Sequence, residues 1–196
     1  MHINWQLREL NLKIVYYGPA LSGKTTNIEK IHSKVDPRRR SDLVSLKTEG
    51  DRTLFFDFLQ LELGKIGTLT PKIHLYTVPG QSYYQASRKL VLRGTDGVVF
   101  VADSSRERVA DNLESLRSMR EHLDALGMPI DTLPIIFQWN KQDLDEALSP
   151  FEMKRLLNAY DHPSFSATAI EGVGVFETLK EITKSVVASV QAEVAV

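Results

Sequence analysis

The chain has 196 residues, of which 42% are apolar and 25% are charged, and its formal net charge is −1. This size and composition suit one domain with a full apolar core, which we expect to span residues 1–196. The near-neutral charge gives no sign of a nucleic-acid-binding protein. The absence of cysteine excludes disulfides, thiol catalysis, cysteine-based zinc sites and thiol lipidation.

The sequence has no long apolar run and no signal peptide, and its second residue is His2 rather than the glycine that myristoylation needs. We therefore expect a cytoplasmic protein with no direct lipid anchor. Any contact with a membrane should then go through a partner.

Short apolar strands alternate with helix-length amphipathic segments along the chain. In chain order, strands are predicted at residues 12–17, 54–63, 72–78, 97–103, 133–139 and near 164. Helices are predicted at about residues 24–35, 106–126, from 149 onward and 173–192. Residues 64–67 predict a hairpin between the second and third strands. This rhythm predicts an α/β fold with a mostly parallel central sheet and helices on both faces.

Residues 2–10, before the first of these strands, do not belong to this alternation of strands and helices. Its apolar residues Ile3, Trp5 and Leu7 alternate with polar ones. Because such alternation is typical of a half-buried strand, we expect residues 2–10 to form an added N-terminal strand.

Residues 18–25 read Gly-Pro-Ala-Leu-Ser-Gly-Lys-Thr and fit the phosphate-binding P-loop pattern, with a predicted strand before and a helix after. Backbone N–H groups and the helix N-terminus of such a loop point at phosphate oxygens. Gly18 and Gly23 permit the tight turn, Lys24 offers a charge to the β- and γ-phosphates, and Thr25 offers a hydroxyl to Mg²⁺. The predicted phosphate-site residues are Gly18, Pro19, Ala20, Leu21, Ser22, Gly23, Lys24, Thr25 and Thr26.

Residues 140–143 read Asn-Lys-Gln-Asp and follow a predicted strand, at the edge where doubly wound sheets bind ligands. Asp143 can accept hydrogen bonds from N1–H and the 2-amino group of guanine, whereas adenine would leave the carboxylate unpaired. Asn140 can contact the base edge and connect this loop to the P-loop, and Lys141 can lie across the ring. A backbone N–H for the guanine O6 could come from Ser166, Ala167 and Thr168. Together the two motifs predict a pocket for GTP.

The order of these motifs, across residues 18–168, resembles that of the small GTPases of the Ras superfamily. The resemblance also includes a switch I threonine, Thr53, and a switch II segment, Pro79-Gly80-Gln81. More narrowly, residues 17–19, 23–27, 51–58 and 77–81 resemble the MglA family of bacterial gliding-motility and cell-polarity GTPases. The resemblance implies a three-layer P-loop NTPase fold, the small G domain. It also implies a Mg²⁺-dependent switch that hydrolyses GTP to GDP and controls polarity and motility through nucleotide-dependent partner binding.

The resemblance also implies roles for the switch residues. Gln81 is expected to orient the attacking water, and the Gly80 N–H to sense the γ-phosphate. Arg52 is predicted to act as an arginine finger in cis, the alternative being a solvated arginine in a loop. The predicted catalytic residues are therefore Gln81, Arg52, Thr53 and Lys24, and the predicted metal ligands are Thr25 and Thr53.

The partner that the resemblance implies is a Roadblock-type GTPase-activating protein, MglB-like and expected to be a homodimer. It would position Arg52 and Gln81 without inserting an arginine of its own. Further partners would be downstream polarity and motility effectors, which could recruit the protein to the cell pole.

Two residues depart from the Ras pattern. Thr77 stands where most small GTPases have an aspartate that holds a Mg²⁺-bound water, so we expect Mg²⁺ to depend more on Thr25, Thr53 and the phosphates. Ala20 stands where Ras-type loops have glycine, and its methyl group could obstruct Gln81 and slow hydrolysis. These departures leave open a GTP-dependent scaffold with negligible hydrolysis. A P-loop ATPase or small-molecule kinase is disfavoured by the guanine-reading motif.

Overall fold

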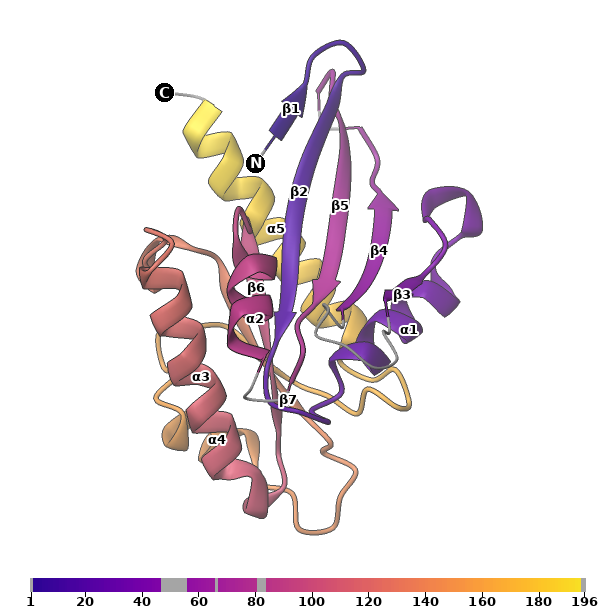
Figure 1. Cartoon of the computed structure of the whole chain (residues 1–196). Coiled ribbons are helices and arrows are strands. Elements are labelled where there is room, and N and C mark those ends of the chain that lie inside the picture. Colours follow the sequence, from indigo (N-terminus) through magenta and orange to yellow (C-terminus); the bar gives the residue numbers. More distant parts are fainter. Residues whose placement is uncertain (1, 47–55, 66, 81–83, 195–196) are drawn as a thin grey trace.

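The computed structural model describes residues 2–46, 56–65, 67–80 and 84–194, which build an eight-stranded sheet with helices packed on it (Figure 1). The strands are β1 (His2–Asn4), β2 (Glu9–Tyr17), β3 (Val44–Leu46), β4 (Phe56–Glu62), β5 (Thr70–Thr77), β6 (Gly97–Asp103), β7 (Ile135–Asn140) and β8 (Ser164–Ser166). Their order is β3-β4-β5-β2-β6-β7-β8, with β1 paired to β2.

The centre of the sheet is parallel. Strands β5, β2, β6, β7 and β8 run in one direction, while β3 and β4 add an antiparallel edge. β4 and β5 are antiparallel neighbours, as the predicted hairpin requires. β6 is buried along its whole length, as its continuous apolar sequence predicts for a strand covered on both faces. The expected mostly parallel sheet is confirmed.

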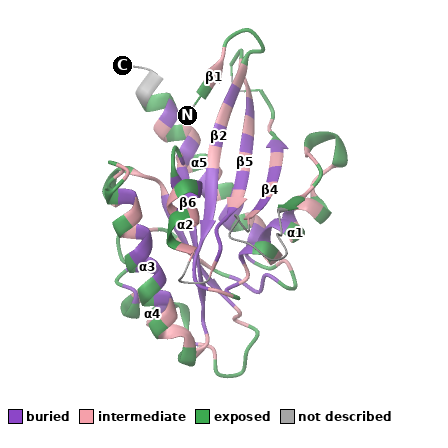
Figure 2. Cartoon of the chain, in the orientation of Figure 1, coloured by how far each residue is buried: buried purple, intermediate pink, exposed green. Residues whose placement is uncertain are grey.

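Helices cover both faces of the sheet. They are α1 (Lys24–Lys34), α2 (Gln85–Leu92), α3 (Val109–Asp124), α4 (Pro150–Leu156) and α5 (Val175–Val194). Apolar residues of α1 and α5 pack in one buried cluster, and those of α2, α3 and α4 pack in a second one. Figure 2 shows the buried residues concentrated along the central strands and on the helix surfaces turned toward them. The described helices include none that is long and apolar enough to cross a membrane.

The extra N-terminal strand expected within residues 2–10 is confirmed but is short: β1 covers His2–Asn4 and forms a hairpin with β2. Only β1 pairs with β2, in the antiparallel register His2↔Asn11 to Asn4↔Glu9. The chain then turns back, with Arg8 at φ 53°. Trp5 and Leu7 lie in this turn and are 70% and 65% exposed. The apolar alternation was misleading here because these side chains have no core surface to pack on.

Two elements were not predicted at all. β3 has only three residues. α2 has eight, and its buried face includes the charged residue Arg88 beside Val91 and Leu92. The long helix predicted from residue 106 begins as a 3₁₀ turn, Arg106–Arg108, and becomes α-helical at Val109. The remaining elements lie within a few residues of their predicted bounds.

The parallel strands determine where the motifs meet. β2, β6 and β7 run side by side, and their carboxyl ends are Tyr17, Asp103 and Asn140. The P-loop follows the first of these strands and the guanine-reading motif begins at the end of the third. The fold therefore brings residues more than a hundred positions apart to one edge of the sheet, where ligands bind in such folds.

Candidate nucleotide-binding site

The P-loop turns through backbone conformations that favour glycine. Gly18 and Gly23 have φ of 147° and 99°, and Leu21 has 62°. A Cβ on Gly18 would lie 2.2 Å from the Val101 carbonyl oxygen, and one on Gly23 would lie 2.1 Å from Asn140 Nδ2. Both glycines are therefore required by their surroundings, as the sequence predicts.

The loop retains polar groups that a phosphate would satisfy. The N–H groups of residues 21–23 make no hydrogen bond to another described residue. The buried Ser22 hydroxyl also lacks a partner among the described residues. Unpaired buried polar groups are costly, and successive N–H groups in such a turn form an anion-binding concavity. The loop therefore fits a phosphate chain.

Lys24 is a buried amine at the first position of α1. Its Nζ donates to the Pro19 and Gly18 carbonyl oxygens at 2.6 and 3.1 Å. Burial, followed by the nearby Arg88 guanidinium, lowers the pKa of Lys24 from an ordinary 10.5 to about 7, although Asp57 opposes the shift. An anion beside Nζ would restore the charge of the ammonium group, so Lys24 suits phosphate binding.

An acidic residue that the sequence did not single out lies beside Thr25. The Thr25 hydroxyl donates to Asp57 Oδ2 at 2.6 Å, and Asp57 is 7% exposed. The Thr77 hydroxyl donates to the same oxygen at 2.9 Å and accepts from the Asp57 N–H at 2.8 Å. Ser45 donates to the other carboxylate oxygen at 2.7 Å. These hard oxygen ligands fit Mg²⁺, and Asp57 supplies the negative charge that Thr77 lacks.

A sequence signal for Asp57 existed. In β4, residues alternate between buried and half-buried positions, and Asp57 shares the buried parity with Leu59 and Leu61. A carboxylate at a core-facing strand position is unusual and indicates a partner or a function. The expectation that Mg²⁺ depends more on Thr25, Thr53 and the phosphates did not include Asp57.

Asn140 joins three loops. Its Nδ2 donates to the Ser22 carbonyl oxygen at 2.7 Å, and its Oδ1 accepts from the Ala169 N–H at 2.8 Å. The side chain is 3% exposed. Asn140 thus connects the base-reading loop to the P-loop, as predicted, and also to the loop after β8.

The other two residues of the motif that were predicted to contact the base, Lys141 and Asp143, remain accessible. Lys141 has φ 68°, and its Nζ lies 2.6 Å from the carboxylate of Asp103. Burial alone would raise the pKa of Asp103, but hydrogen bonds from Lys141 and Ser105 outweigh it and hold that pKa below its ordinary value. Asp143 is exposed at the start of the following turn. Its carboxylate is therefore open to solvent, where a base could reach it.

The triplet of residues 166–168 is only partly available to a base. The Ala167 N–H donates to the Trp139 carbonyl at 2.9 Å and the Thr168 N–H to the Val173 carbonyl at 3.1 Å. Ser166 is exposed and ends β8. In this arrangement neither the Ala167 nor the Thr168 N–H is free for the guanine O6.

At the start of α1, Thr26 is half-buried and Asn27 is fully buried. Asn27 and Gln138 of β7 exchange two amide hydrogen bonds, of 2.8 and 3.0 Å. Gln138 also donates to Thr178 of α5 at 3.0 Å. Asn27 Nδ2 also donates to the Gly23 carbonyl oxygen at 2.9 Å, so Asn27 connects α1 to both the sheet and the P-loop.

Switch II approaches the P-loop at Gly80. A Cβ there would lie 2.4 Å from Ala20 Cα and 2.6 Å from Ala20 N, so glycine is required at this position. Arg108, at the end of the 3₁₀ turn, donates to the Ala20 carbonyl at 2.7 Å. The predicted residues Arg52, Thr53 and Gln81 lie outside the described part of the chain.

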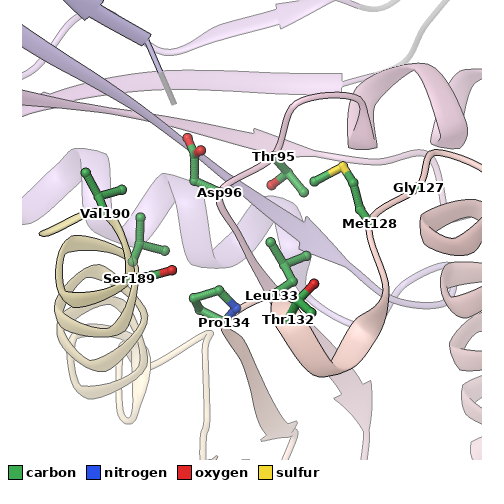
Figure 3. Close-up of a pocket in the computed structure, with 10 residues that line it drawn as sticks. Thr95, Asp96, Gly127, Met128, Thr132, Leu133, Pro134, Ser189 and Val190 are labelled. Carbon is green, nitrogen blue, oxygen red and sulfur yellow. The ribbon is translucent and has the colours of Figure 1, made fainter. Parts of the chain in front are cut away.

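A separate hollow of about 210 Å³ lies at the opposite edge of the sheet (Figure 3). It is lined by residues that precede β6 and β7, such as Thr95, Asp96 and Pro134, and by Ser189 and Val190 of α5. Because the strands are parallel, this edge is remote from the P-loop. The hollow is therefore not part of the candidate nucleotide site.

Comparison with known proteins agrees with this geometry. The chain is 52% identical over 184 residues to the mutual gliding-motility protein MglA of Myxococcus xanthus, covering 94% of each chain. It is 30% identical over 145 residues to human ADP-ribosylation factor-like protein 4A, covering 74% of this chain and 64% of that one.

The fold is shared with a solved structure, the Arl6 BBS3 small GTPase of Trypanosoma brucei with the bound nucleotide analogue GppNp. The TM-score is 0.68, the sequence identity is 22%, and the match covers 92% of this chain and 99% of the other. The model of the ADP-ribosylation factor family matches residues 2–186. With the P-loop and the guanine-reading motif meeting at one sheet edge, the chain belongs to the ADP-ribosylation factor family of small GTPases.

Proposed function

We propose that this protein is a GTP-binding switch that hydrolyses GTP slowly to GDP. The observation that carries the proposal is the position of Asn140, whose amide joins the base-reading loop to the Ser22 carbonyl of the P-loop at 2.7 Å. The two half-sites, one for phosphates and one for guanine, thereby form a single pocket. A shared pocket supports recognition of a whole guanine nucleotide rather than of phosphate alone.

The phosphate half would be held by residues 18–26. N–H groups of the loop would donate to phosphate oxygens, and Lys24, charged again beside an anion, would hold the β- and γ-phosphates. At the base, Asp143 would accept from N1–H and the 2-amino group, with Lys141 along the ring. These contacts would select GTP over ATP because adenine leaves the carboxylate unpaired.

Thr25 and, through the closing of switch I, Thr53 would hold Mg²⁺, with Asp57 holding its water ligands in place of an acidic residue at position 77. Mg²⁺ bound there would neutralise charge on the β- and γ-phosphates. Thr77 orients the Asp57 carboxylate through its hydroxyl, at 2.9 Å. The departure at Thr77 is thus compensated by a residue from the neighbouring strand.

For hydrolysis, Gln81 would orient the attacking water and Gly80 would sense the γ-phosphate through its N–H. Arg52 would neutralise charge on the transferred phosphoryl group as a finger in cis. In this proposal Arg52→Ala abolishes most of the stimulated turnover. Full stimulation of that variant would rule out the finger.

The likeness to a relative named for gliding motility supports a role in motility, and we propose that this role includes control of cell polarity. The proposed partners are a Roadblock-type GTPase-activating homodimer and downstream effectors that recruit the chain to the cell pole. Since phosphoryl transfer depends on positioning, such an activator need only order Arg52 and Gln81.

The test is single-turnover GTP hydrolysis with Mg²⁺, with and without a purified Roadblock-type partner. Guanine-specific binding with slow turnover that the partner accelerates would support the switch. Equal competition by ATP would refute guanine selection, and the absence of any hydrolysis with the partner would refute the enzymatic part.

One contact favours a second candidate, a GTP-dependent scaffold with negligible hydrolysis. Gly80 lies close to Ala20: a Cβ atom at position 80 would be only 2.4 Å from Ala20 Cα. In this candidate the Ala20 methyl group, next to the residue that precedes Gln81, would obstruct Gln81. Ala20→Gly separates the candidates: a large gain in turnover identifies the methyl group as the obstruction, and no gain removes this support for the scaffold.

A further inference from the structure

The most unusual charged residue outside the P-loop is Arg88 of α2. Its side chain is 2% exposed, and no carboxylate among the described residues forms an ion pair with it. Arginine keeps its charge under all ordinary conditions, so this is a permanently buried cation. Burying an unpaired charge is costly, and the position therefore needs a compensating interaction.

The compensation comes from the backbone of switch II. Arg88 Nε donates to the Pro79 carbonyl oxygen at 2.8 Å, and one of its terminal nitrogens donates to the Gly80 carbonyl oxygen. The planar guanidinium spans two consecutive carbonyls, which a lysine ammonium on its flexible stem would not hold in the same geometry. Arg88 thus contacts the two residues that immediately precede Gln81.

The other side of the guanidinium faces an aromatic ring. Arg88 Cζ lies 5.5 Å from the centroid of the Tyr17 ring, within the range of a cation–π contact. The Tyr17 hydroxyl lies 3.3 Å from Ser118 Oγ of α3, and Ser118 donates to Gln85 of α2 at 2.8 Å. The Tyr17 ring that faces Arg88 is therefore part of β2 and is linked through Ser118 to α3 and α2.

The carbonyls that Arg88 holds determine where switch II lies. Gly80 rests against the P-loop so closely that a Cβ would overlap Ala20. Ala20 is also hydrogen-bonded to Arg108, whose terminal nitrogen donates to the Ala20 carbonyl. Arg88 therefore stabilises an arrangement in which Gly80 is closed onto the P-loop.

We propose that Arg88 is a positioning residue that holds Pro79 and Gly80 closed against the P-loop and thereby favours GTP over GDP. The inference rests on the proposed function. Only GTP has the γ-phosphate that the Gly80 N–H is expected to contact. A protein that already holds Gly80 in place spends less of the binding free energy of GTP on ordering this segment. GDP gains nothing from this contact.

The test compares affinities for mant-labelled GDP and a non-hydrolysable GTP analogue in Arg88→Met, with thermal unfolding measured on the same samples. We expect the analogue to bind roughly tenfold or more weakly, as loss of two hydrogen bonds from a charged donor implies, with GDP affected less than about threefold. Arg93→Met is the matched control, because Arg93 is an exposed arginine directly after α2. It should leave both affinities unchanged.

Arg88→Lys keeps the charge but not the fork, and it decides the question if the methionine variant does not fold. A shift in the analogue-to-GDP ratio in the same direction supports the proposal. An equal loss of both affinities, or an unchanged ratio in a folded variant, overturns it and assigns Arg88 a structural role. Failure of the unsubstituted protein to bind either nucleotide would instead refute the proposed function.

Discussion

Asp57 on β4 and Thr77 on β5 are joined by two hydrogen bonds: the Asp57 backbone N–H donates to the Thr77 hydroxyl oxygen, and that hydroxyl donates to Asp57 Oδ2. The β4–β5 register pairs Phe58 with Tyr76, so these two residues are the next pair along the ladder. A threonine at position 77 therefore directs an acidic side chain from the neighbouring strand toward Thr25. The negative charge beside the P-loop comes from β4 rather than β5.

Removing that charge should weaken Mg²⁺ binding. We expect Asp57→Asn, which keeps shape but loses the negative charge, to lower the affinity for Mg²⁺ in the nucleotide complex by about tenfold or more. The measurement is release of a fluorescent nucleotide as EDTA is titrated in. Ser45→Ala removes a hydrogen bond to the same carboxylate without removing charge and should have a much smaller effect. Equal release from the two variants would contradict this role.

The lowered pKa of Lys24 predicts proton uptake when nucleotide binds. In the nucleotide-free protein the group has a pKa of about 7 against an ordinary 10.5, so its stabilising contribution is complete above 10.5 and is lost as the pH falls toward 7. Phosphate reverses the preference by favouring the ammonium form. At pH 8.5 binding should therefore take up close to about one proton. Calorimetry in buffers of different ionisation enthalpy measures this, and Lys24→Met should abolish the uptake.

Asn140 should matter for stability as well as for binding. Asn140→Ala leaves the Ser22 carbonyl and the Ala169 N–H without their partner, and we expect a loss of about 1–3 kcal/mol in unfolding free energy. Chemical denaturation without nucleotide measures it. The exposed Asp143 offers the contrast: Asp143→Asn should leave stability within about 0.5 kcal/mol while reducing the preference for guanine. A stable Asn140→Ala protein would show that the three loops hold together without this amide.

The buried amide pair of Asn27 and Gln138 predicts a larger effect on the free energy of unfolding. Gln138→Leu removes one hydrogen-bond partner from Asn27 and one from Thr178, each fully buried, and should cost about 2–4 kcal/mol of stability. The paired variant Asn27→Leu with Gln138→Leu should recover part of that loss, since fewer polar groups then remain unsatisfied. Thermal unfolding of both variants checks this, and a double variant less stable than the single one would argue against the pair acting as a unit.

The motifs were readable from the sequence because each is contiguous. The residue types within 18–25 and 140–143 determine the backbone conformation of each motif. The apolar strands that precede the two motifs place them at one edge of the sheet. Asp57 and Arg88 could not be assigned in the same way. The role of Asp57 depends on the register between β4 and β5, which no local pattern encodes. Arg88 interrupts the apolar face of α2, so the helix lacks the periodic pattern that would have predicted it. The hydrogen-bond partners of Arg88 are backbone carbonyls, which no sequence pattern identifies.

The same limit explains the N-terminal segment. Alternating apolar residues predicted a strand over residues 2–10, but the length of β1 depends on how much of β2 is left unpaired by β6. β6 pairs with β2 from Ile14 onward, and β1 pairs with the stretch from Glu9 to Asn11. The stretch of β2 that β6 leaves unpaired can be identified only from the assembled sheet.

That pairing has a consequence for the behaviour of the protein at high concentration. β6 pairs with one edge of β2 only from Ile14 onward. Without β1, the backbone groups of Glu9 to Asn11 on that edge would be unpaired and could pair with strands of other molecules. The hairpin satisfies those groups within the molecule. It thereby helps to keep copies of this small GTPase from assembling edge to edge.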